Sequence, residues 1–277
     1  ANLATLRDRG VEVLEPGTGA LGSPGEWGVG RLPEPAELLA AVEARLGAVA
    51  GGSLDGLRVL VTAGGTREPI DAVRYVGNRS SGKMGWALAE EAARRGANVT
   101  VVAANVSLPR SPAVEYVEVG TAAELGAACA ERFPSADVLL MAAAVADYRP
   151  ASARADKIKK TAAGETLALE LERTDDVLSA LAAQRRPGQL LIGFAAESGD
   201  GALAYARDKL ERKRLDAVVV NDVSRPGIAF DAADNEVTIV TAEGERHVPQ
   251  ASKAAIAGAI LDSVLSRRSS SAVRVES

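Results

Sequence analysis

The residues best suited to chemistry lie in one stretch, Thr62 to Gly85, where arginines, a lysine and an asparagine stand among glycines. An apolar run precedes this stretch and predicts a buried strand, and apolar residues at helical spacing follow it. A polar loop between such elements lies at the carboxyl edge of a parallel sheet, where open α/β folds bind ligands. Ser80, Ser81 and Gly82 stand where the helix begins, so its unpaired N–H groups and its dipole favour a phosphate or a carboxylate there.

Two nucleotide-binding motifs nearly fit this loop. Residues 77–83 read GNRSSGK, but Met84 stands where a P-loop needs Ser or Thr to hold magnesium. The dinucleotide-binding fingerprint is GxGxxG, and the spacing of Gly64-Gly65 does not match it. The fingerprint also requires an acidic residue at the end of the second strand, where this chain has Asn105. A P-loop NTPase is therefore disfavoured, and an NAD(P) enzyme is a weak alternative. A loop that only turns the chain would explain the glycines but not the cations.

Further candidate site residues follow the later predicted strands. Asp147 comes just past an apolar run, and therefore at the same predicted sheet edge as the first loop. Lys157 belongs to a charged run in a long loop, and Phe194 ends another apolar run. Lys209 and Lys213 are spaced i, i+4 and share one face of a predicted helix. Taken singly, these residues also fit ordinary roles, namely a turn aspartate, a packed phenylalanine and a solvated charged face.

Composition excludes several classes of protein. The 277 residues are 47% hydrophobic, which is enough for a buried core, and the net charge of −5 gives no basic face for nucleic acid. With Cys129 and His247 as the sole cysteine and histidine, a disulfide framework, a His-based zinc site and a catalytic triad are disfavoured. No run approaches the length of a transmembrane helix and no signal peptide is recognisable, so we expect a soluble, cytoplasmic protein without membrane contact.

The elements that must position these residues alternate between strand and helix. This alternation predicts an α/β fold with a doubly wound, mostly parallel, Rossmann-like sheet and an added antiparallel hairpin. Thr121 and Glu124 predict a capping box, and Thr174 is the expected cap of a later helix, with Asp175 and Asp176 in its first turn. The expected strands are 57–61, 98–103, 114–119, 136–144, 167–171, 190–195 and 217–220; the expected helices are 83–95, 122–132, 200–214 and 250–266; and the expected hairpin is 236–248.

The two ends of the chain differ from its regular middle. Residues 1–52 predict a short strand at 11–14, a glycine-rich loop at 16–30 and a helix at 35–50, which together look like the C-terminal remnant of another domain and a linker. Residues 53–266 form the expected main domain. The serine-rich residues 267–277 are expected to be a disordered tail.

The main domain contains the motifs TAGGTREP (62–69), YVGN (75–78), SSGKMG (80–85), AAVADY (143–148), KIKK (157–160) and GFAAE (193–197). These motifs resemble those of phosphopantothenate–cysteine ligase, which in bacteria is often the C-terminal half of a fusion with phosphopantothenoylcysteine decarboxylase. The resemblance spans about residues 54–266. The opening residues and the segment GVGRLPEP also resemble the end of the decarboxylase, although Ser23-Pro24-Gly25 stands near the place of its acidic cysteine.

The resemblance implies a specific reaction. The carboxylate of 4′-phosphopantothenate attacks the α-phosphate of CTP to give an acyl-cytidylate and pyrophosphate, and the amine of cysteine then forms the amide and releases CMP. Mg²⁺ is the implied metal ion, and CTP is the co-substrate. FMN is implied only for the decarboxylase domain, whose flavin-binding body this sequence lacks, so no decarboxylase activity is expected. The family also implies a homodimer with substrate sites near the partner subunit.

The resemblance assigns roles to particular residues. Asn78 is implied to hold the acyl-cytidylate and Lys209 to act with it in catalysis, while Arg74 binds substrate charge. Ser80, Ser81 and Gly82 are implied to offer N–H groups to a phosphate. The cytidine is framed by Ala143, Asp147 and Phe194; the triphosphate meets Lys157, Lys209 and Lys213; and Asp147 is the expected Mg²⁺ ligand, with Asp176 as a second candidate near the nucleotide.

Two alternatives from other classes stay open at this point. One is an NAD(P)-binding oxidoreductase, which would bind NADH and not CTP. The other is a non-catalytic nucleotide-binding module, which would bind CTP without turnover.

Overall fold

The computed structural model of the chain describes residues 53–159, 166–197, 201–222 and 234–273, together with short pieces of the first 52 residues (5, 13–14, 17–20, 27–32, 35, 38 and 39). The chain divides into two compact units, Ala1–Gly51 and Gly52–Ser277.

The first unit contains an antiparallel pair of strands, β1 (Gly17–Ala20) and β2 (Trp27–Arg31). Both lie in the stretch predicted to be loop, whereas the described residues of the predicted strand, Val13 and Leu14, are not in a strand. The prediction was wrong because glycine weakens a strand without forbidding local pairing. Pro35, Leu38 and Leu39 are helical, as predicted, and Ser23–Gly25 lie outside the described residues.

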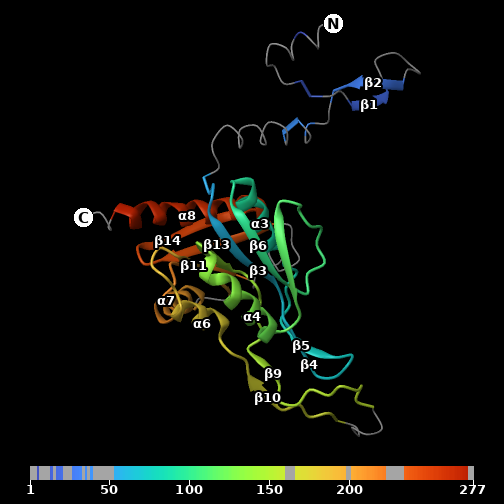
Figure 1. Cartoon of the computed structure of the whole chain (residues 1–277), viewed down its shortest axis with the longest axis vertical. Coiled ribbons are helices and arrows are strands. Elements are labelled where there is room, and N and C mark those ends of the chain that lie inside the picture. The colour runs from blue at the N-terminus through green and yellow to red at the C-terminus, as the bar shows by residue number, and fades with distance from the viewer. Residues whose placement is uncertain are drawn as a thin grey trace. The chain divides into compact units, whose positions relative to one another are not determined.

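The second unit is built on an eight-stranded sheet of order β14-β13-β12-β11-β8-β3-β6-β7 (Figure 1). The six strands from β12 to β7 are parallel, and β13 and β14 add an antiparallel hairpin at one edge. The predicted doubly wound, mostly parallel sheet with a hairpin is thus confirmed. The strands are β3 (Arg58–Gly64), β6 (Asn98–Ala104), β7 (Val114–Val119), β8 (Val138–Met141), β11 (Leu190–Glu197), β12 (Ala217–Asp222), β13 (Asp234–Thr241) and β14 (Gly244–Ser252).

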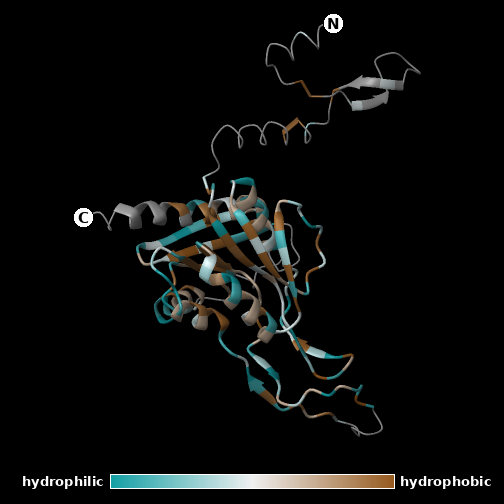
Figure 2. Ribbon diagram, viewed as in Figure 1, coloured by the Kyte–Doolittle hydropathy of each residue, from teal (hydrophilic) through white to brown (hydrophobic). Residues whose placement is uncertain are grey.

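Helices cover both faces of the sheet. One face packs on α3 (Lys83–Arg94) and α8 (Lys253–Val273), and the other on α4 (Ala122–Arg132), α6 (Val177–Ala183) and α7 (Ala202–Arg212), with the short 3₁₀ turn η1 (Phe133–Ser135) after α4. Alternate strand residues therefore enter different cores: in β3, Val59 and Val61 pack under α3 while Leu60 faces α4. Figure 2 shows the resulting hydrophobic strands in the middle of the unit.

Side-chain caps fix the starts of two helices near the site. The capping box of Thr121 and Glu124 at the start of α4 is present as predicted. The cap of α6 is Asp176, which accepts a hydrogen bond from the Ser179 N–H at 3.0 Å, and not Thr174. The hydroxyl of Thr174 instead donates to the carbonyl of Ala146 at 2.6 Å, because the turn after β8 passes beside it.

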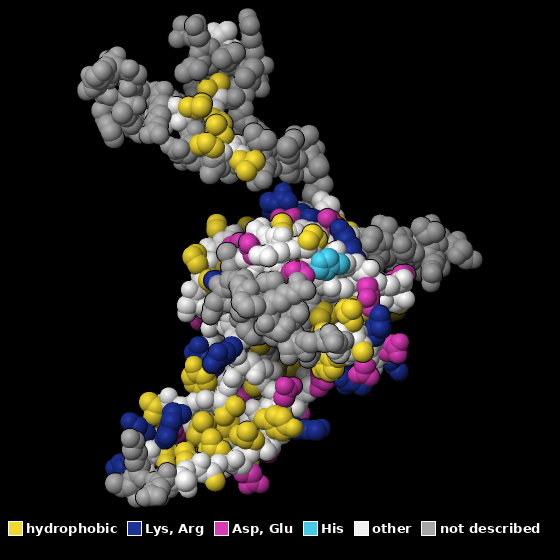
Figure 3. All heavy atoms as spheres, turned by 180° about the vertical axis from the view of Figure 1, so that it is seen from behind, with side chains coloured by type: hydrophobic (Ala, Val, Ile, Leu, Met, Phe, Trp, Pro, Cys, Tyr) yellow, Lys and Arg dark blue, Asp and Glu magenta, His cyan; other side chains and the backbone are white. Residues whose placement is uncertain are grey.

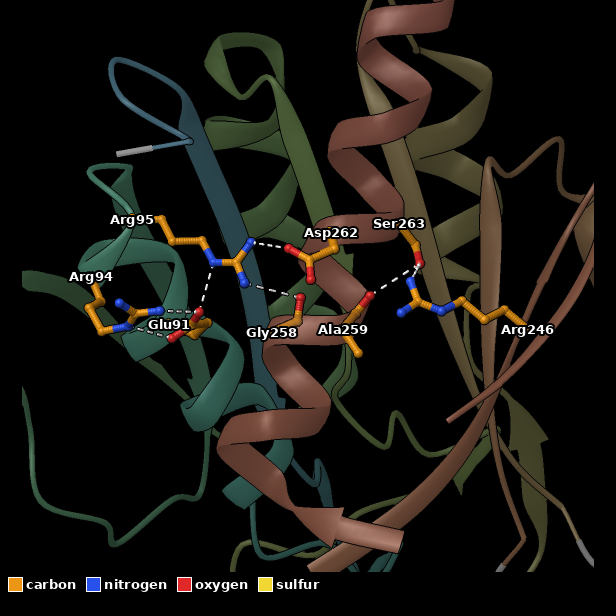
Figure 4. A network of polar contacts seen from close by, with 8 residues as sticks. All are labelled: Glu91, Arg94, Arg95, Arg246, Gly258, Ala259, Asp262 and Ser263. Atoms are coloured by element: carbon orange, nitrogen blue, oxygen red, sulfur yellow. Dashed lines mark hydrogen bonds and ion pairs between the residues drawn. The ribbon is translucent and has the colours of Figure 1, made fainter. Parts of the chain in front are cut away.

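Helix α8 is attached to α3 by a polar network (Figure 4). The Arg95 guanidinium donates to Glu91, to Asp262 at 2.6 Å and to the carbonyl of Gly258 at 3.2 Å. The helix continues to Val273, where the sequence predicted a disordered tail from residue 267. Adding residues to an existing helix is inexpensive, and this tail contains no Gly or Pro to stop it.

An arm extends from the carboxyl edge of the sheet (Figure 1). It consists of β4 (Arg67–Pro69), β5 (Tyr75–Gly77), β9 (Tyr148–Pro150), β10 (Leu171–Arg173) and the described loop residues 70–74, 151–159 and 166–170. Strands β4 and β5 form one antiparallel pair, and β9 and β10 another. The predicted strand at 167–171 is reduced to β10, because the alternating residues before Leu171 lie in a loop with exposed side chains.

A buried carboxylate joins the two halves of the arm. The Asp71 side chain, which is fully buried, accepts hydrogen bonds from Arg74 Nε at 3.0 Å and from the Ile158 N–H at 3.0 Å. Arg74 also donates to the carbonyl of Ile158 at 3.0 Å. Asp71 and Arg74 together therefore fix the backbone next to Lys157.

We expect Asp71→Asn to lower the melting temperature at neutral pH, because an amide cannot replace the charge-assisted hydrogen bonds from Arg74. Those bonds hold the pKa of the Asp71 carboxyl well below its usual range. Its stabilisation is therefore complete above the unfolded pKa of about 3.9 and is lost as the pH falls toward the folded value.

Thermal unfolding measured at a series of pH values tests this. The difference in melting temperature between wild type and Asp71→Asn should persist down to about pH 4 and should narrow below that pH. Asp262→Asn, which removes an exposed carboxylate from Arg95, is the matched control. A difference that stays constant into strong acid would contradict the prediction.

Candidate functional site

The site lies where the sheet reverses its direction of winding. From β3 the chain adds β6 and β7 on one side, then returns to add β8, β11 and β12 on the other. The loops that follow the neighbouring strands β3 and β8 therefore leave the same edge and separate there, which opens a crevice. Backbone hydrogen bonds join the two loops: Ala144 N–H donates to Gly64 at 2.8 Å, and Thr66 N–H donates to Ala144 at 3.2 Å.

A cavity of about 580 Å³ opens at this crevice. It is lined by residues from the loop before α3, the turn after β8, the start of α6, the end of β11 and the helix α7. Seven residues assigned from the sequence line it, namely Asn78, Ala143, Asp147, Asp176, Phe194, Lys209 and Lys213. Residues separated by more than a hundred positions are thus brought to one hollow.

Asn78 is positioned by a close approach of two backbone segments. A Cβ atom on Gly65 would lie 2.7 Å from the carbonyl oxygen of Asn78, so only glycine permits this packing. The Asn78 side-chain amide also donates to the carbonyl of Val145 at 2.9 Å. Asn78 is therefore held against the turn that carries Asp147.

The two lysines of α7 are held at the cavity by specific partners. Lys209 Nζ donates to the carbonyl of Phe194 at 2.7 Å, and Lys213 Nζ donates to Asp176 Oδ1 at 2.8 Å. The Lys213 side chain is 12% exposed, so it does not belong to a solvated face. Burial raises the pKa of Asp176, but the hydrogen bonds from Lys213 and Ser179 outweigh it, and the net pKa lies below its ordinary value. Asp176 is thus a carboxylate at neutral pH.

A second, smaller cavity of about 140 Å³ adjoins the first. Ser80, Ser81 and Gly82 line it, and Gly82, with φ of +76°, is the N-cap of α3 without a capping side chain. The two cavities share a wall formed by Ala143, Ala144 and residues 194–196. The predicted anion-binding helix start therefore faces a hollow beside the main cavity.

Sequence reasoning missed three polar residues of the smaller cavity: Asn221 at the end of β12, Asn235 in β13, and Lys253 at the start of α8. Asn235 and Lys253 carried no motif, because the antiparallel hairpin that brings them back to the sheet edge is a long-range arrangement.

Arg74 and Lys157 do not line either cavity. Both lie on the arm, where Arg74 bonds to Asp71 and Ile158. Within one chain, the structure therefore brings together ten of the twelve residues that the sequence singled out, in two adjoining hollows, and leaves these two outside.

Two other side chains that could do chemistry, Cys129 and Asn105, do not act in the site. Burial raises the pKa of the Cys129 thiol to about 12, so this cysteine is not a nucleophile at neutral pH. Asn105 donates to the carbonyls of Gly65 and Gly120 and has a structural role at the strand end where a dinucleotide fold needs an acid.

In the described ranges no cluster of three His, Cys, Asp or Glu side chains is placed to hold a metal ion. Asp147, Asp175 and Asp176 line one cavity, which fits Mg²⁺ held by one or two carboxylates and by phosphates.

No helix in the part of the chain that the structure describes has both the length and the apolar character needed to cross a membrane.

Comparison with known sequences gives a consistent result. The family described as DNA/pantothenate metabolism flavoprotein C-terminal domain matches residues 54–267. The chain is 46% identical over 275 residues to the coenzyme A biosynthesis bifunctional protein CoaBC of Mycolicibacterium smegmatis, covering 95% of this chain and 66% of that protein. It is 39% identical over 267 residues to CoaBC of Escherichia coli, covering 96% and 65%. The chain thus spans just under two thirds of the length of these relatives.

Solved structures agree with the sequence comparison. The C-terminal domain of a CoaBC protein matches with a TM-score of 0.66 and 36% identity, over 78% of this chain and 97% of that one. The DNA/pantothenate metabolism flavoprotein of Streptococcus pneumoniae matches with a TM-score of 0.67 and 25% identity, over 76% and 100%. A Cab2 mutant in complex with phosphopantothenate-cysteine, 18% identical over 88% of this chain and 97% of that one with a TM-score of 0.68, shares the fold. From its site, its fold and these matches together, the chain belongs to the family of the DNA/pantothenate metabolism flavoprotein C-terminal domain.

Proposed function

We propose that this chain is a CTP-dependent phosphopantothenate–cysteine ligase of coenzyme A biosynthesis. The observation that supports this most directly is the main cavity, where Asn78, Asp147, Phe194, Lys209 and Lys213 meet from separate segments. The relatives whose alignments cover 95% or more of this chain are named as coenzyme A biosynthesis proteins, which agrees with the proposal.

The reaction proceeds in two steps. A carboxylate oxygen of 4′-phosphopantothenate bonds to the α-phosphorus of CTP, the bond from that phosphorus to the oxygen bridging to the β-phosphate breaks, and pyrophosphate leaves. The nitrogen of the neutral amine of cysteine then bonds to the acyl carbon, the bond from that carbon to the cytidylate oxygen breaks, CMP leaves, and the nitrogen loses one proton to water to become the amide N–H. Positioning and charge neutralisation, and no covalent protein intermediate, lower both barriers.

The residues of the main cavity supply those two effects. The amide of Asn78, anchored to Val145, holds the acyl-cytidylate, since an amide offers both a donor and an acceptor. Lys209 and Lys213 neutralise phosphate charge, and Asp147, Ala143 and Phe194 frame the cytidine. The N-terminus of α3, at residues 80–82, takes a phosphate.

Mg²⁺ held with the nucleotide would supply further neutralisation of the phosphate oxygens. Asp147 would hold it, with Asp176 beside the nucleotide as a second carboxylate of the same cavity. Because the Asp176 pKa is lowered, this group keeps its charge across the neutral range.

The enzyme acts as a homodimer through its arm. Six large hydrophobic side chains on the arm are 41–59% exposed, and outside it only Tyr205 is comparable in the described part of the second unit. Figure 3 shows this hydrophobic surface on the arm. Contiguous exposed hydrophobic surface on a soluble protein marks an interface. In the dimer, Arg74 and Lys157 act at the substrate site near the partner subunit, and Lys157 meets the triphosphate. The six residues are Val73, Tyr75, Tyr148, Leu167, Leu169 and Leu171.

The wild-type chain should release pyrophosphate from CTP when 4′-phosphopantothenate is present, and should release CMP and amide only when cysteine is added. Coupled pyrophosphate detection and mass spectrometry of the product measure the two steps. CTP binding without turnover would identify a non-catalytic module. NADH binding seen by fluorescence, with no binding of CTP, would identify an oxidoreductase.

Asn78→Ala should fold normally and bind CTP, but should lose at least about a hundredfold in amide formation, as removal of a single transition-state donor does. Steady-state rates and CTP titration measure the two effects. Asn98→Ala, an exposed asparagine at the opposite edge of the sheet, is the matched control. Turnover like the wild type in Asn78→Ala would remove this residue from the mechanism.

Introducing charge on the arm should separate the dimer. Leu169→Asp with Leu171→Asp should shift the sedimentation coefficient toward the monomer and reduce activity, since Arg74 and Lys157 no longer reach a partner's cavity. Asn98→Asp introduces charge far from the arm and should stay dimeric. A wild-type protein that sediments as a monomer at micromolar concentration would contradict the proposed assembly.

A further inference from the structure

We infer that Arg79 is a further catalytic residue, whose guanidinium neutralises the charge that develops on the oxygen bridging the α- and β-phosphates of CTP as pyrophosphate leaves. This inference rests on the proposed ligase function and adds a residue to its first step. Its basis is the point at which the loop before α3 passes from one cavity to the other, together with the partners of the other cations in the main cavity.

The loop crosses between the two cavities directly after Arg79. Asn78 and Arg79 line the main cavity, whereas residues 80–85 line the smaller one. Asn78 is the proposed holder of the acyl-cytidylate, and the start of α3 at residues 80–82 is the proposed phosphate site. A nucleotide whose α-phosphate lies beside Asn78 and whose terminal phosphates reach the start of α3 must therefore pass Arg79.

The dimensions of the chain agree with this placement. Neighbouring Cα atoms are about 3.8 Å apart across a trans peptide bond. Arg79 is one residue from Asn78 and one residue from Ser80, so its long side chain can reach any atom that lies between those two residues. The bond between the α-phosphorus and the bridging oxygen, which breaks in the first step, is within that reach.

Arg79 differs from the other cations of the main cavity in having no protein partner. Among the described residues, three cationic side chains line this cavity, namely Arg79, Lys209 and Lys213. Lys209 Nζ donates to the carbonyl of Phe194 at 2.7 Å. Lys213 Nζ donates to Asp176 at 2.8 Å. Within the described ranges, neither a hydrogen bond nor an ion pair engages the exposed Arg79 side chain, so a ligand can bind it without displacing a protein group.

The chemistry of the first step requires a cation at this bridging oxygen. As the carboxylate oxygen bonds to the α-phosphorus, the bridging oxygen takes the electron pair of the breaking bond and leaves with pyrophosphate. Negative charge on that oxygen is larger in the transition state than in bound CTP, so a cation there lowers the barrier. A guanidinium suits this position because its planar fork can donate two parallel hydrogen bonds to phosphate oxygens.

Pyrophosphate exchange tests the first step alone. Labelled pyrophosphate is incorporated into CTP in the presence of phosphopantothenate and in the absence of cysteine. In Arg79→Ala the maximal exchange rate should fall about a hundred- to a thousandfold, as loss of a single transition-state donor does. The dissociation constant for CTP should change much less, because the contact strengthens only in the transition state.

Two controls separate this role from an effect on folding or on overall charge. The melting temperature of Arg79→Ala should match that of the wild type, because no protein partner of Arg79 is lost. Arg207→Ala removes an exposed arginine of α7 and should keep the exchange rate of the wild type.

Guanidinium ion in solution identifies the missing group. At concentrations far below those that unfold proteins, it should restore part of the exchange rate of Arg79→Ala. Urea has the same shape without the charge and should restore none. A purely structural role would give no such difference between the two additives.

Three results would overturn the inference. The first is wild-type exchange in Arg79→Ala. The second is a CTP dissociation constant that rises in the same proportion as exchange falls, since Arg79 would then bind the ground state and the transition state equally. The third is a loss that guanidinium does not relieve. Absence of phosphopantothenate-dependent exchange in the wild type would instead refute the ligase function itself.

Discussion

The structure depends on one topological constraint, the reversal of winding between β3 and β8. Parallel strands need crossover connections, so each loop leaves the sheet at its carboxyl edge, and only at the reversal do two adjacent loops turn apart. The hydrogen bonds of Ala144 with Gly64 and Thr66 hold the two loops together at their base. Everything proposed about the site follows from the crevice that opens beyond those bonds.

Polar groups in that crevice are held by partners that cannot move independently of the sheet. Asn78 bonds to a carbonyl of the turn after β8, and Lys209 bonds to a carbonyl at the end of β11. Asp176 serves both as the cap of α6 and as the partner of Lys213. Each side chain is thereby preorganised, which is what the proposed reaction, dominated by phosphate charge, requires. The cost of ordering the lysines is met during folding and not during turnover.

The arm is ordered by hydrogen bonds and not by a hydrophobic core. Its strands are short and its large hydrophobic side chains stay exposed, so its internal order comes from Asp71, which binds Arg74 and the backbone of Ile158. A buried carboxylate is tolerated there because it accepts several hydrogen bonds, including charge-assisted ones. The arm therefore presents cations and hydrophobic surface together, a combination suited to completing a site in a second copy of the chain.

The sequence alone determined the order of strands and helices, the capping box at Thr121 and most of the singled-out residues that line the two cavities, because hydrophobic period, capping chemistry and motifs act over short distances. It misplaced the strands at 167–171 and in residues 11–30, where weak alternation and glycine leave the choice to tertiary pairing. It also gave no sign of Asn235 or Lys253. Only the tertiary structure decided which of the charged residues share a hollow and which stand apart on the arm, because a cavity is made by elements whose contacts span much of the chain, and the local pattern of residues does not encode such distances.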